Sequence, residues 1–242
     1  MRKFLLLNLV TISFLFAQGH TFESNGKRVN IIELYTSQGC SSCPPADKWL
    51  SKLKNHPKLF TKFIPMAFHV TYWDFIGWKD IFADKLNDNR QRYYANKIWK
   101  NNSVYTPQFI INTKEYRKWF SNQSFPKFDE QYGGKLISQF DNNLLKVSYY
   151  NKNIKNEKLY LNIAILGFDY KIDIKSGENK NKLLEHDFVV IKHIQKFAEI
   201  KNNNLKIETK LAPFRKENNK YALAVWISSY NTNILQATGG YI

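Results

Sequence analysis

The chain has 242 residues, of which 43% are hydrophobic and 16% aromatic, so it can fill a sizeable core and is not an intrinsically disordered protein. Its formal net charge is +16, but the lysines are scattered among asparagines, and the sequence contains no helix-turn-helix, zinc-finger or RNA-binding motif. We therefore interpret the charge as a solvated surface and expect no nucleic-acid partner.

The first 19 residues are typical of a signal peptide. A basic start precedes an apolar run over residues 4–16, and Ala-Gln-Gly at residues 17–19 fits the small-x-small rule for cleavage. The run is shorter than the roughly 20 apolar residues that a membrane span needs. We expect residues 1–19 to be removed and the mature protein to be periplasmic or secreted, with no stable membrane span and an oligomeric state left open.

The two cysteines of the chain, Cys40 and Cys43, form a single CxxC motif. A disulfide between residues so close closes almost no loop, and it would therefore add little stability. No second CxxC or HxxxH is present to complete a four-ligand zinc site. The motif indicates redox chemistry of a Cys40–Cys43 disulfide, without a separate cofactor.

Short runs on either side of this motif predict a strand followed by a helix. Residues 29–36 are rich in β-branched and aromatic side chains, residues 37–39 interrupt them, and apolar side chains recur at helical spacing over residues 46–53. The cysteines therefore lie at a strand-to-helix junction, where free backbone N–H groups and the helix dipole favour a thiolate. The same dipole explains an acidic residue, Asp47, in the first turn.

The next segments predict further elements of the same domain. We expect a strand over residues 63–70, helices over residues 81–99, a hairpin of residues 108–112 and 116–120, and a helix over residues 128–140. A proline directly precedes the strand at residue 108, and an X-Pro bond adopts the cis form at modest cost. We predict that Pro107 is cis and presents the backbone of Thr106 beside the two cysteines.

Beyond residue 142 the pattern changes to alternating strands. They are expected over residues 145–149, 158–165, 188–194, 205–209 and 221–227, separated by Asn/Lys-rich turns. This half has no cysteine. The alternation predicts a small all-β, sandwich-like accessory domain over residues 143–242 that binds or packs against the redox domain.

The CxxC motif followed by Thr106-Pro107 resembles the thioredoxin superfamily, and the loop before Cys40 resembles its glutaredoxin version. More closely, four segments resemble a family of secreted bacterial thioredoxin-like proteins catalogued as domain of unknown function 1223: residues 33–47, 69–74, 77–78 and 105–108. Weaker similarity continues at residues 176–179 and 222–238. The resemblance implies an α/β thioredoxin-like redox domain over residues 27–142, with a central mixed sheet flanked by helices.

The same resemblance implies roles for the residues of the site. Cys40 would be the exposed nucleophile, Cys43 the resolving thiol, and Pro107, preceded by Thr106, the cis-proline. Four further residues within or beside the motif are candidates for substrate binding: Ser41, Ser42, Tyr72 and Trp73. Aromatic side chains are also common in protein cores, so a packing role for the last two stays open.

We predict from these residues an exported thiol-disulfide oxidoreductase that acts on a protein or a small thiol or disulfide. An alternative is a copper carrier, in which Cys40, Cys43 and His69 form a thiolate-imidazole site for Cu(I). His69 can equally be an ordinary hydrogen-bonded residue. A third reading is a non-catalytic interaction module with a structural disulfide.

Overall fold

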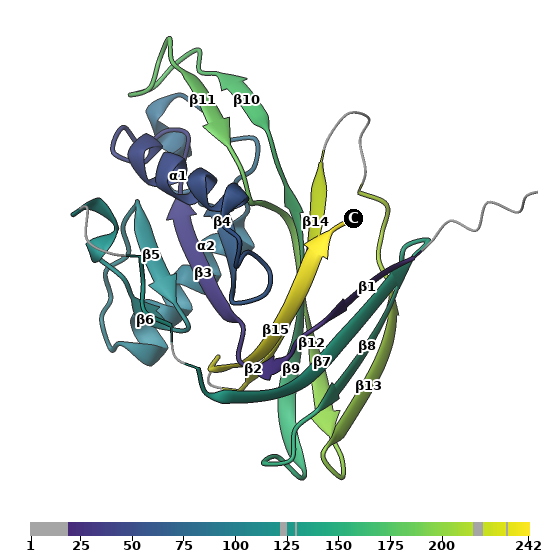
Figure 1. Cartoon of the computed structure of the whole chain (residues 1–242). Helices are drawn as coiled ribbons and strands as arrows, with labels where there is room; N and C mark the ends of the chain where they lie inside the picture. Colours follow the sequence, from purple (N-terminus) through teal and green to yellow (C-terminus); the bar gives the residue numbers. More distant parts are fainter. Residues whose placement is uncertain (1–18, 122–124, 129, 215–219, 231) are drawn as a thin grey trace, which may run out of the picture.

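The structure, a computed structural model, describes residues 19–121, 125–128, 130–214, 220–230 and 232–242 (Figure 1). Within these residues the chain is predominantly β, with 15 strands and two short α-helices. The predicted signal peptide lies outside the described residues, apart from Gly19.

The larger sheet has eight strands in the order β15-β14-β9-β12-β4-β3-β5-β6. Their bounds are β3 (Asn30–Thr36), β4 (Phe63–His69), β5 (Gln108–Ile111), β6 (Lys114–Glu115), β9 (Glu157–Gly167), β12 (Val189–Ile200), β14 (Tyr221–Ser229) and β15 (Ile234–Tyr241). β3 and β4 are parallel, and β4 meets β12 in parallel where Ala67 pairs with Val189. Strands from both halves of the chain therefore share one sheet, which crosses the boundary expected at residue 142.

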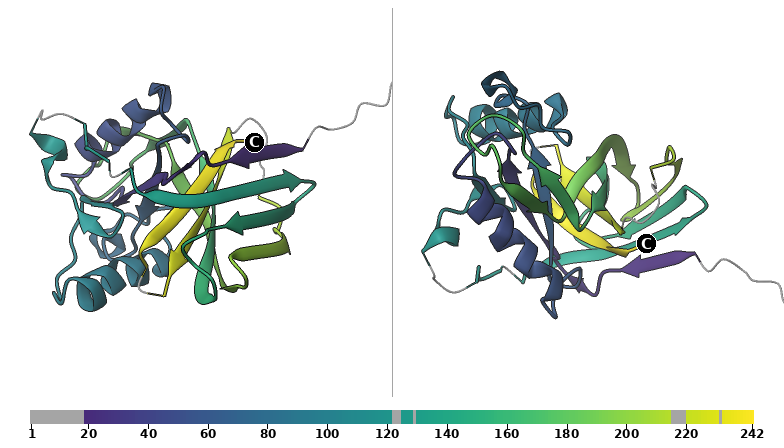
Figure 2. Two further views of the ribbon diagram at one scale, coloured as in Figure 1. Left: turned by 60° about the horizontal axis from the view of Figure 1, so that its bottom comes forward. Right: turned by 90° about the horizontal axis from the view of Figure 1, so that it is seen from above.

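The smaller sheet has the strand order β1-β7-β8-β13, and the short β2 also pairs with β7. Its bounds are β1 (His20–Glu23), β2 (Gly26–Lys27), β7 (Tyr132–Asp141), β8 (Leu144–Tyr150) and β13 (Asn204–Lys210). Figure 2 shows β7 crossing over β15 of the larger sheet, and the two strands are in contact. The two sheets are thus stacked layers.

The buried strand β9 shows how the layers share the core. Successive side chains of a strand point to opposite faces. Ala164 and Leu166 belong to the core that also contains residues of β3 and β4, whereas Ile163 and Ile165 belong to the core beneath the smaller sheet. Both faces of β9 are covered, which is why its run of apolar residues is nearly continuous.

The two helices lie against opposite faces of β3, because Thr36 contacts Asp47 of α1, whereas Glu33, which points to the other face of the strand, contacts Arg90 of α2. α1 (Pro44–Ser51) buries Ala46 and Leu50, and two prolines occupy its first turn, where a missing N–H costs least. α2 (Lys85–Tyr93) is capped by the Asp84 carboxylate and continues as a π-helical turn to Ile98. The remaining helical segments are short 3₁₀ turns at residues 52–55, 74–76 and 118–120. The hairpin of β10 (Tyr170–Asp173) and β11 (Leu183–His186) packs against α1 (Figure 1).

The predicted fold class is wrong. We expected an α/β thioredoxin-like domain flanked by helices and then a separate all-β domain, but the protein is mostly β with several sheets and two short helices. One cause is the segment 128–140, predicted as a helix, most of which forms the strand β7. Its burial alternates with a period of two, and a Cβ on Gly133 would lie 2.7 Å from the Leu235 carbonyl oxygen, so strands pack closely here.

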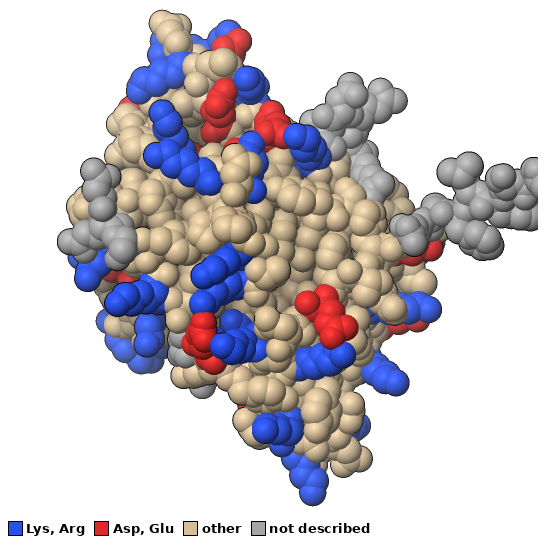
Figure 3. Space-filling view, in the orientation of Figure 1, with Lys and Arg blue, Asp and Glu red and all other residues tan. Residues whose placement is uncertain are grey.

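The surface of the described residues offers two further observations. No helix among them is long and apolar enough to cross a membrane. Lys and Arg side chains are spread over the face in Figure 3, with Asp and Glu between them.

Candidate active site

Cys40 and Cys43 lie in the connection between β3 and α1, at the strand-to-helix junction that the sequence predicts. The Cys43 N–H donates to the Cys40 carbonyl oxygen at 3.2 Å, and Cys43 is the N-cap residue of α1. Both thiols are free. Ser41 and Ser42 are exposed between them. The motif is therefore a dithiol, wound into the first turn of the helix.

The segment before β5 brings Thr106 and Pro107 to the same place. The Thr106–Pro107 bond is cis, as predicted, and the Thr106 carbonyl oxygen lies 3.7 Å from Cys40 Sγ. On its other side, Cys40 Sγ is 3.2 Å from the Ser42 hydroxyl oxygen. Residues separated by more than 60 positions thus contact one sulfur.

The two thiols differ in acidity because their surroundings differ. A hydrogen bond from Cys43, supported by others from Ser42 and at Thr106, lowers the pKa of Cys40 from 9.0 to about 6. Burial raises the pKa of Cys43 well above its ordinary value, and the hydrogen bond to Cys40 raises it further. Cys40 is therefore the thiol that ionises first, with Cys43 as its proton-bearing donor.

The two predicted aromatic residues lie beside this site and are half-buried. The Trp73 indole N–H donates to the Thr106 hydroxyl oxygen at 2.7 Å. The Tyr72 hydroxyl donates to Gln91 at 3.0 Å, and the charge of Cys43 acts on Tyr72 to raise its pKa, after the larger effect of burial. Trp73 therefore orients Thr106, and Tyr72 is tied to α2 behind the site.

A loop from the second half of the chain is hydrogen-bonded to the backbone of the motif. The Asn179 side-chain amide donates to the carbonyl oxygens of Gln38 and Cys40, both at 2.9 Å, and the Glu178 carboxylate accepts from the Ser41 N–H at 3.0 Å. Hydrogen bonds from Ser41 lower the pKa of Glu178. Sequence analysis did not place Glu178 and Asn179 at the site, although the weak family similarity at residues 176–179 was a signal for them.

The burial of Cys40 corrects one prediction about the nucleophile. Cys40 is only 1% exposed, so it is not the exposed thiol that the family resemblance implied. The loop between β10 and β11 is held against the backbone around Cys40 by three hydrogen bonds. The Cys40 sulfur itself lies between the Ser42 hydroxyl and the Thr106 carbonyl oxygen.

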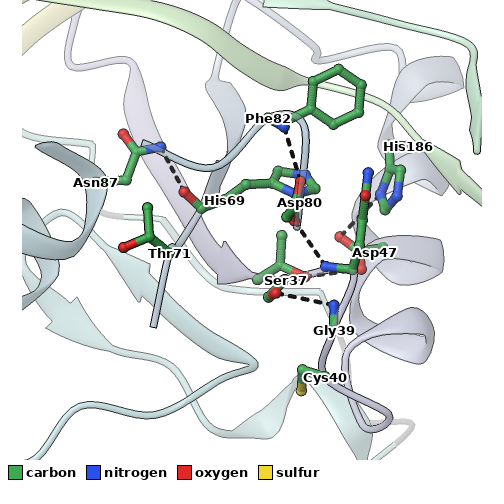
Figure 4. Close-up of polar contacts among 12 residues, drawn as sticks. Ser37, Gly39, Cys40, Asp47, His69, Thr71, Asp80, Phe82, Asn87 and His186 are labelled. Atoms are coloured by element: carbon green, nitrogen blue, oxygen red, sulfur yellow. Dashed lines mark hydrogen bonds and ion pairs between the residues drawn. The ribbon is translucent and has the colours of Figure 1, made fainter. Parts of the chain in front are cut away.

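His69 lies with other ligand-type residues and not with the cysteines. Among the described residues, Asp47, His69 and His186 are grouped so that their donor atoms lie within 4.8 Å of one another, and this group includes no cysteine. Figure 4 shows His69 beside Asp80 and His186, with Cys40 at the far end of the loop. The structure thus does not bring Cys40, Cys43 and His69 together as one ligand set.

These features define a predominantly β protein that carries a buried dithiol at the start of a helix. Residues 31–228 match the family described as "Protein of unknown function (DUF1223)", and the chain belongs to that family. The predicted family is thereby confirmed, whereas this match does not show membership of the thioredoxin superfamily.

Two solved structures are similar over most of the chain. Protein AGR_C_4864 from Agrobacterium tumefaciens has a TM-score of 0.62 and 21% sequence identity, covering 89% of this chain and 94% of that one. HBP35 of Porphyromonas gingivalis has a TM-score of 0.56 and 12% identity, covering 90% of this chain and 76% of that one. At these identities the similarity concerns the fold alone. None of the curated proteins matches the sequence.

Proposed function

We propose that this protein is a thiol-disulfide oxidoreductase that uses Cys40 and Cys43. The observation that carries the proposal is the asymmetry of the pair: the pKa of Cys40 is lowered to about 6, while that of the neighbouring Cys43 is raised. A nucleophilic thiol and a resolving thiol need this division, because the first must be a thiolate and the second must hold a proton until it is required.

In the reducing direction, the Cys40 thiolate attacks one sulfur of a substrate disulfide. A bond forms between Cys40 Sγ and that sulfur, the substrate S–S bond breaks, and the departing thiolate takes up a proton. Cys43 then loses its proton and attacks Cys40 Sγ, so that the Cys40–Cys43 bond forms and the second substrate thiolate leaves and is protonated. Two electrons pass to the substrate, which also gains two protons, one balanced by the proton that Cys43 loses and one taken from water, because Cys40 begins as a thiolate. The reversed steps oxidise a substrate dithiol.

The expected substrate is a protein or a small disulfide. Cys40 is almost fully buried beside the loop that carries Glu178 and Asn179, so it must become accessible before it can react. Export, predicted from the leader at residues 1–19, would place this chemistry in an oxidising compartment.

The experiment uses the reduced protein and glutathione disulfide. The wild type should end as the Cys40–Cys43 disulfide with release of two glutathione molecules, because Cys43 resolves the mixed disulfide. Cys43→Ser should stop at a stable glutathione adduct on Cys40, observed by mass spectrometry under non-reducing conditions. In the control, Cys40→Ser with Cys43→Ser, no adduct should form.

Two results would contradict this function. One is a wild-type protein that keeps a stable glutathione adduct, since Cys43 would then not resolve it. The other is a Cys43→Ser protein that forms no adduct while Cys40→Ser, Cys43→Ser and His69→Ala each abolish tight Cu(I) binding, which would favour the copper carrier.

A further inference from the structure

A buried group of two histidines and two carboxylates lies behind the dithiol, on the other side of the loop that follows β3 (Figure 4). Asp47 comes from α1, His69 from the end of β4 and His186 from the end of β11. The exposed fractions of these three residues are 6%, 0% and 2%. Three elements that are distant in sequence thus place ligand-type side chains in one buried position.

The hydrogen bonds of His69 involve only one of its two ring nitrogens. Its Nδ1 lies 2.7 Å from the Asp80 carboxylate, which itself accepts backbone N–H groups of Gln38 and Phe82. Its Nε2 is buried and has no hydrogen-bond partner among the described residues. Histidines that bind metals commonly have a carboxylate on the other ring nitrogen, which fixes the tautomer and the ring orientation.

His186 differs from His69 in that neither of its ring nitrogens is hydrogen-bonded to a described residue. Both of its ring nitrogens are buried without a hydrogen-bond partner in the part of the chain that the structure describes. Its Nδ1 lies 3.9 Å from Asp47 Oδ1, and its ring packs edge-on against His69 with centroids 4.9 Å apart. Burying a polar group without a partner costs free energy, so a ligand that engages these nitrogens would remove that cost.

We propose that Asp47, His69 and His186 bind a divalent first-row transition-metal ion, for which zinc is the probe. Two imidazoles and one carboxylate are donors that suit such ions and not Mg²⁺ or Ca²⁺. Donors of a tetrahedral zinc site lie about 3.3 Å apart. The donors here lie within 4.8 Å of one another, so small side-chain movements close the site.

The surroundings provide an orienting contact and a path for the ion. Thr36 donates its hydroxyl hydrogen to Asp47 Oδ2, which leaves Oδ1 for the metal. A cavity of about 260 Å³ between α1 and β11 is lined by both Asp47 and His186. Three protein ligands leave a fourth position for water on the metal. The proposal does not rest on the proposed redox function, because none of its ligands is a cysteine.

The first measurement is metal binding by the purified full chain after treatment with a chelator. Isothermal titration should give one Zn²⁺ per chain, and Mg²⁺ should not compete. Zinc at a hundredfold excess over its Kd should raise the melting temperature by about 5–10 °C. The Co²⁺ form should show ligand-field bands without a thiolate-to-cobalt charge-transfer band, because the donors are nitrogen and oxygen.

The variants separate this site from the dithiol and from unspecific histidine binding. His186→Phe should weaken zinc binding at least about tenfold, and its metal-free form should melt no lower than the wild type because His186 makes no hydrogen bond. His193→Phe is the control, since His193 is a half-buried histidine that stacks on Trp226 in another part of the protein. This control and the double variant Cys40→Ser with Cys43→Ser should bind zinc as the wild type does.

A second variant covers the case in which His186→Phe does not fold. Asp47→Asn keeps an oxygen that accepts from Thr36 and should also weaken binding at least about tenfold. The proposal is overturned if the wild type binds no zinc below about 100 µM, or if a folded ligand variant binds as tightly as the wild type. Loss of binding in the cysteine double variant would also overturn it.

Discussion

The hydrogen bond between the two thiols is the contact whose removal tests the site most directly. It is the largest of the influences that lower the pKa of Cys40 from 9.0 to about 6. Cys43→Ala removes the donor, so we expect the pKa of Cys40 to rise toward 9. Cys43→Ser keeps a hydroxyl donor at the same position and should give an intermediate value.

The size of the effect on reactivity depends on two opposing quantities. With a pKa of about 6, Cys40 is about 90% thiolate at pH 7, whereas with a pKa of 9 it would be about 1% thiolate. A thiolate of higher pKa is also more nucleophilic, by about 15–30-fold over this range for a Brønsted coefficient of about 0.4–0.5. A complete return to 9 would therefore slow alkylation at pH 7 by only about 3–6-fold.

The informative assay is consequently the pH at which the alkylation rate is half-maximal. We expect this midpoint near pH 6 for Cys40 in the reduced wild type, rising by at least about one pH unit in Cys43→Ala, as measured with iodoacetamide and peptide mapping. The control Cys40→Ala should react only at strongly alkaline pH, because burial raises the pKa of Cys43. A wild-type midpoint near 9, or identical midpoints in the wild type and Cys43→Ala, would refute the reasoning.

Two further predictions concern the loop beside the site and a buried ion pair. Asn179→Ala removes two hydrogen bonds to the cysteine loop, worth about 1 kcal/mol each, so alkylation of Cys40 should accelerate about 5–30-fold. The control Asn151→Ala changes another buried amide, directly after β8, and should leave the rate unchanged. Equal rates in the two variants would contradict this. Glu33→Gln removes the buried carboxylate that Arg90 contacts at 2.7 and 2.8 Å. Urea denaturation should therefore show that the free energy of unfolding falls by about 3–5 kcal/mol. A decrease below about 1 kcal/mol would count against this prediction.

Short stretches of sequence were sufficient to locate the dithiol. The strand before Cys40, the helix after Cys43 and the cis bond at Pro107 were predicted and are present. These features depend on local chemistry: β-branched residues favour a strand, prolines suit the first helical turn, and only an X-Pro bond adopts the cis form at modest cost.

The assignment of strands to sheets could not be predicted from short stretches of sequence. The runs that form β9 and β14 were expected to build a separate domain, but they join the sheet of β3 and β4 through the pairing of Ala67 with Val189. Periodicity shows which faces of a strand are buried, but it does not show which distant strand lies beside it. The segment forming β7 was misassigned as a helix although its Gly133-Gly134 pair lowers helix propensity, because no local pattern indicated the strands that it pairs with.

The sequence by itself therefore determined the position of the two cysteines at the start of a helix, whereas the tertiary structure decided what surrounds them. Glu178 and Asn179 contact the backbone of the cysteine loop, and His186 faces Asp47, only because β10 and β11 fold back onto α1. In sequence, Asp47 was explained by the helix dipole alone and His186 had no recognisable partner. Contacts between residues more than 130 positions apart depend on how the sheets pack, and no local pattern of residues predicts that packing.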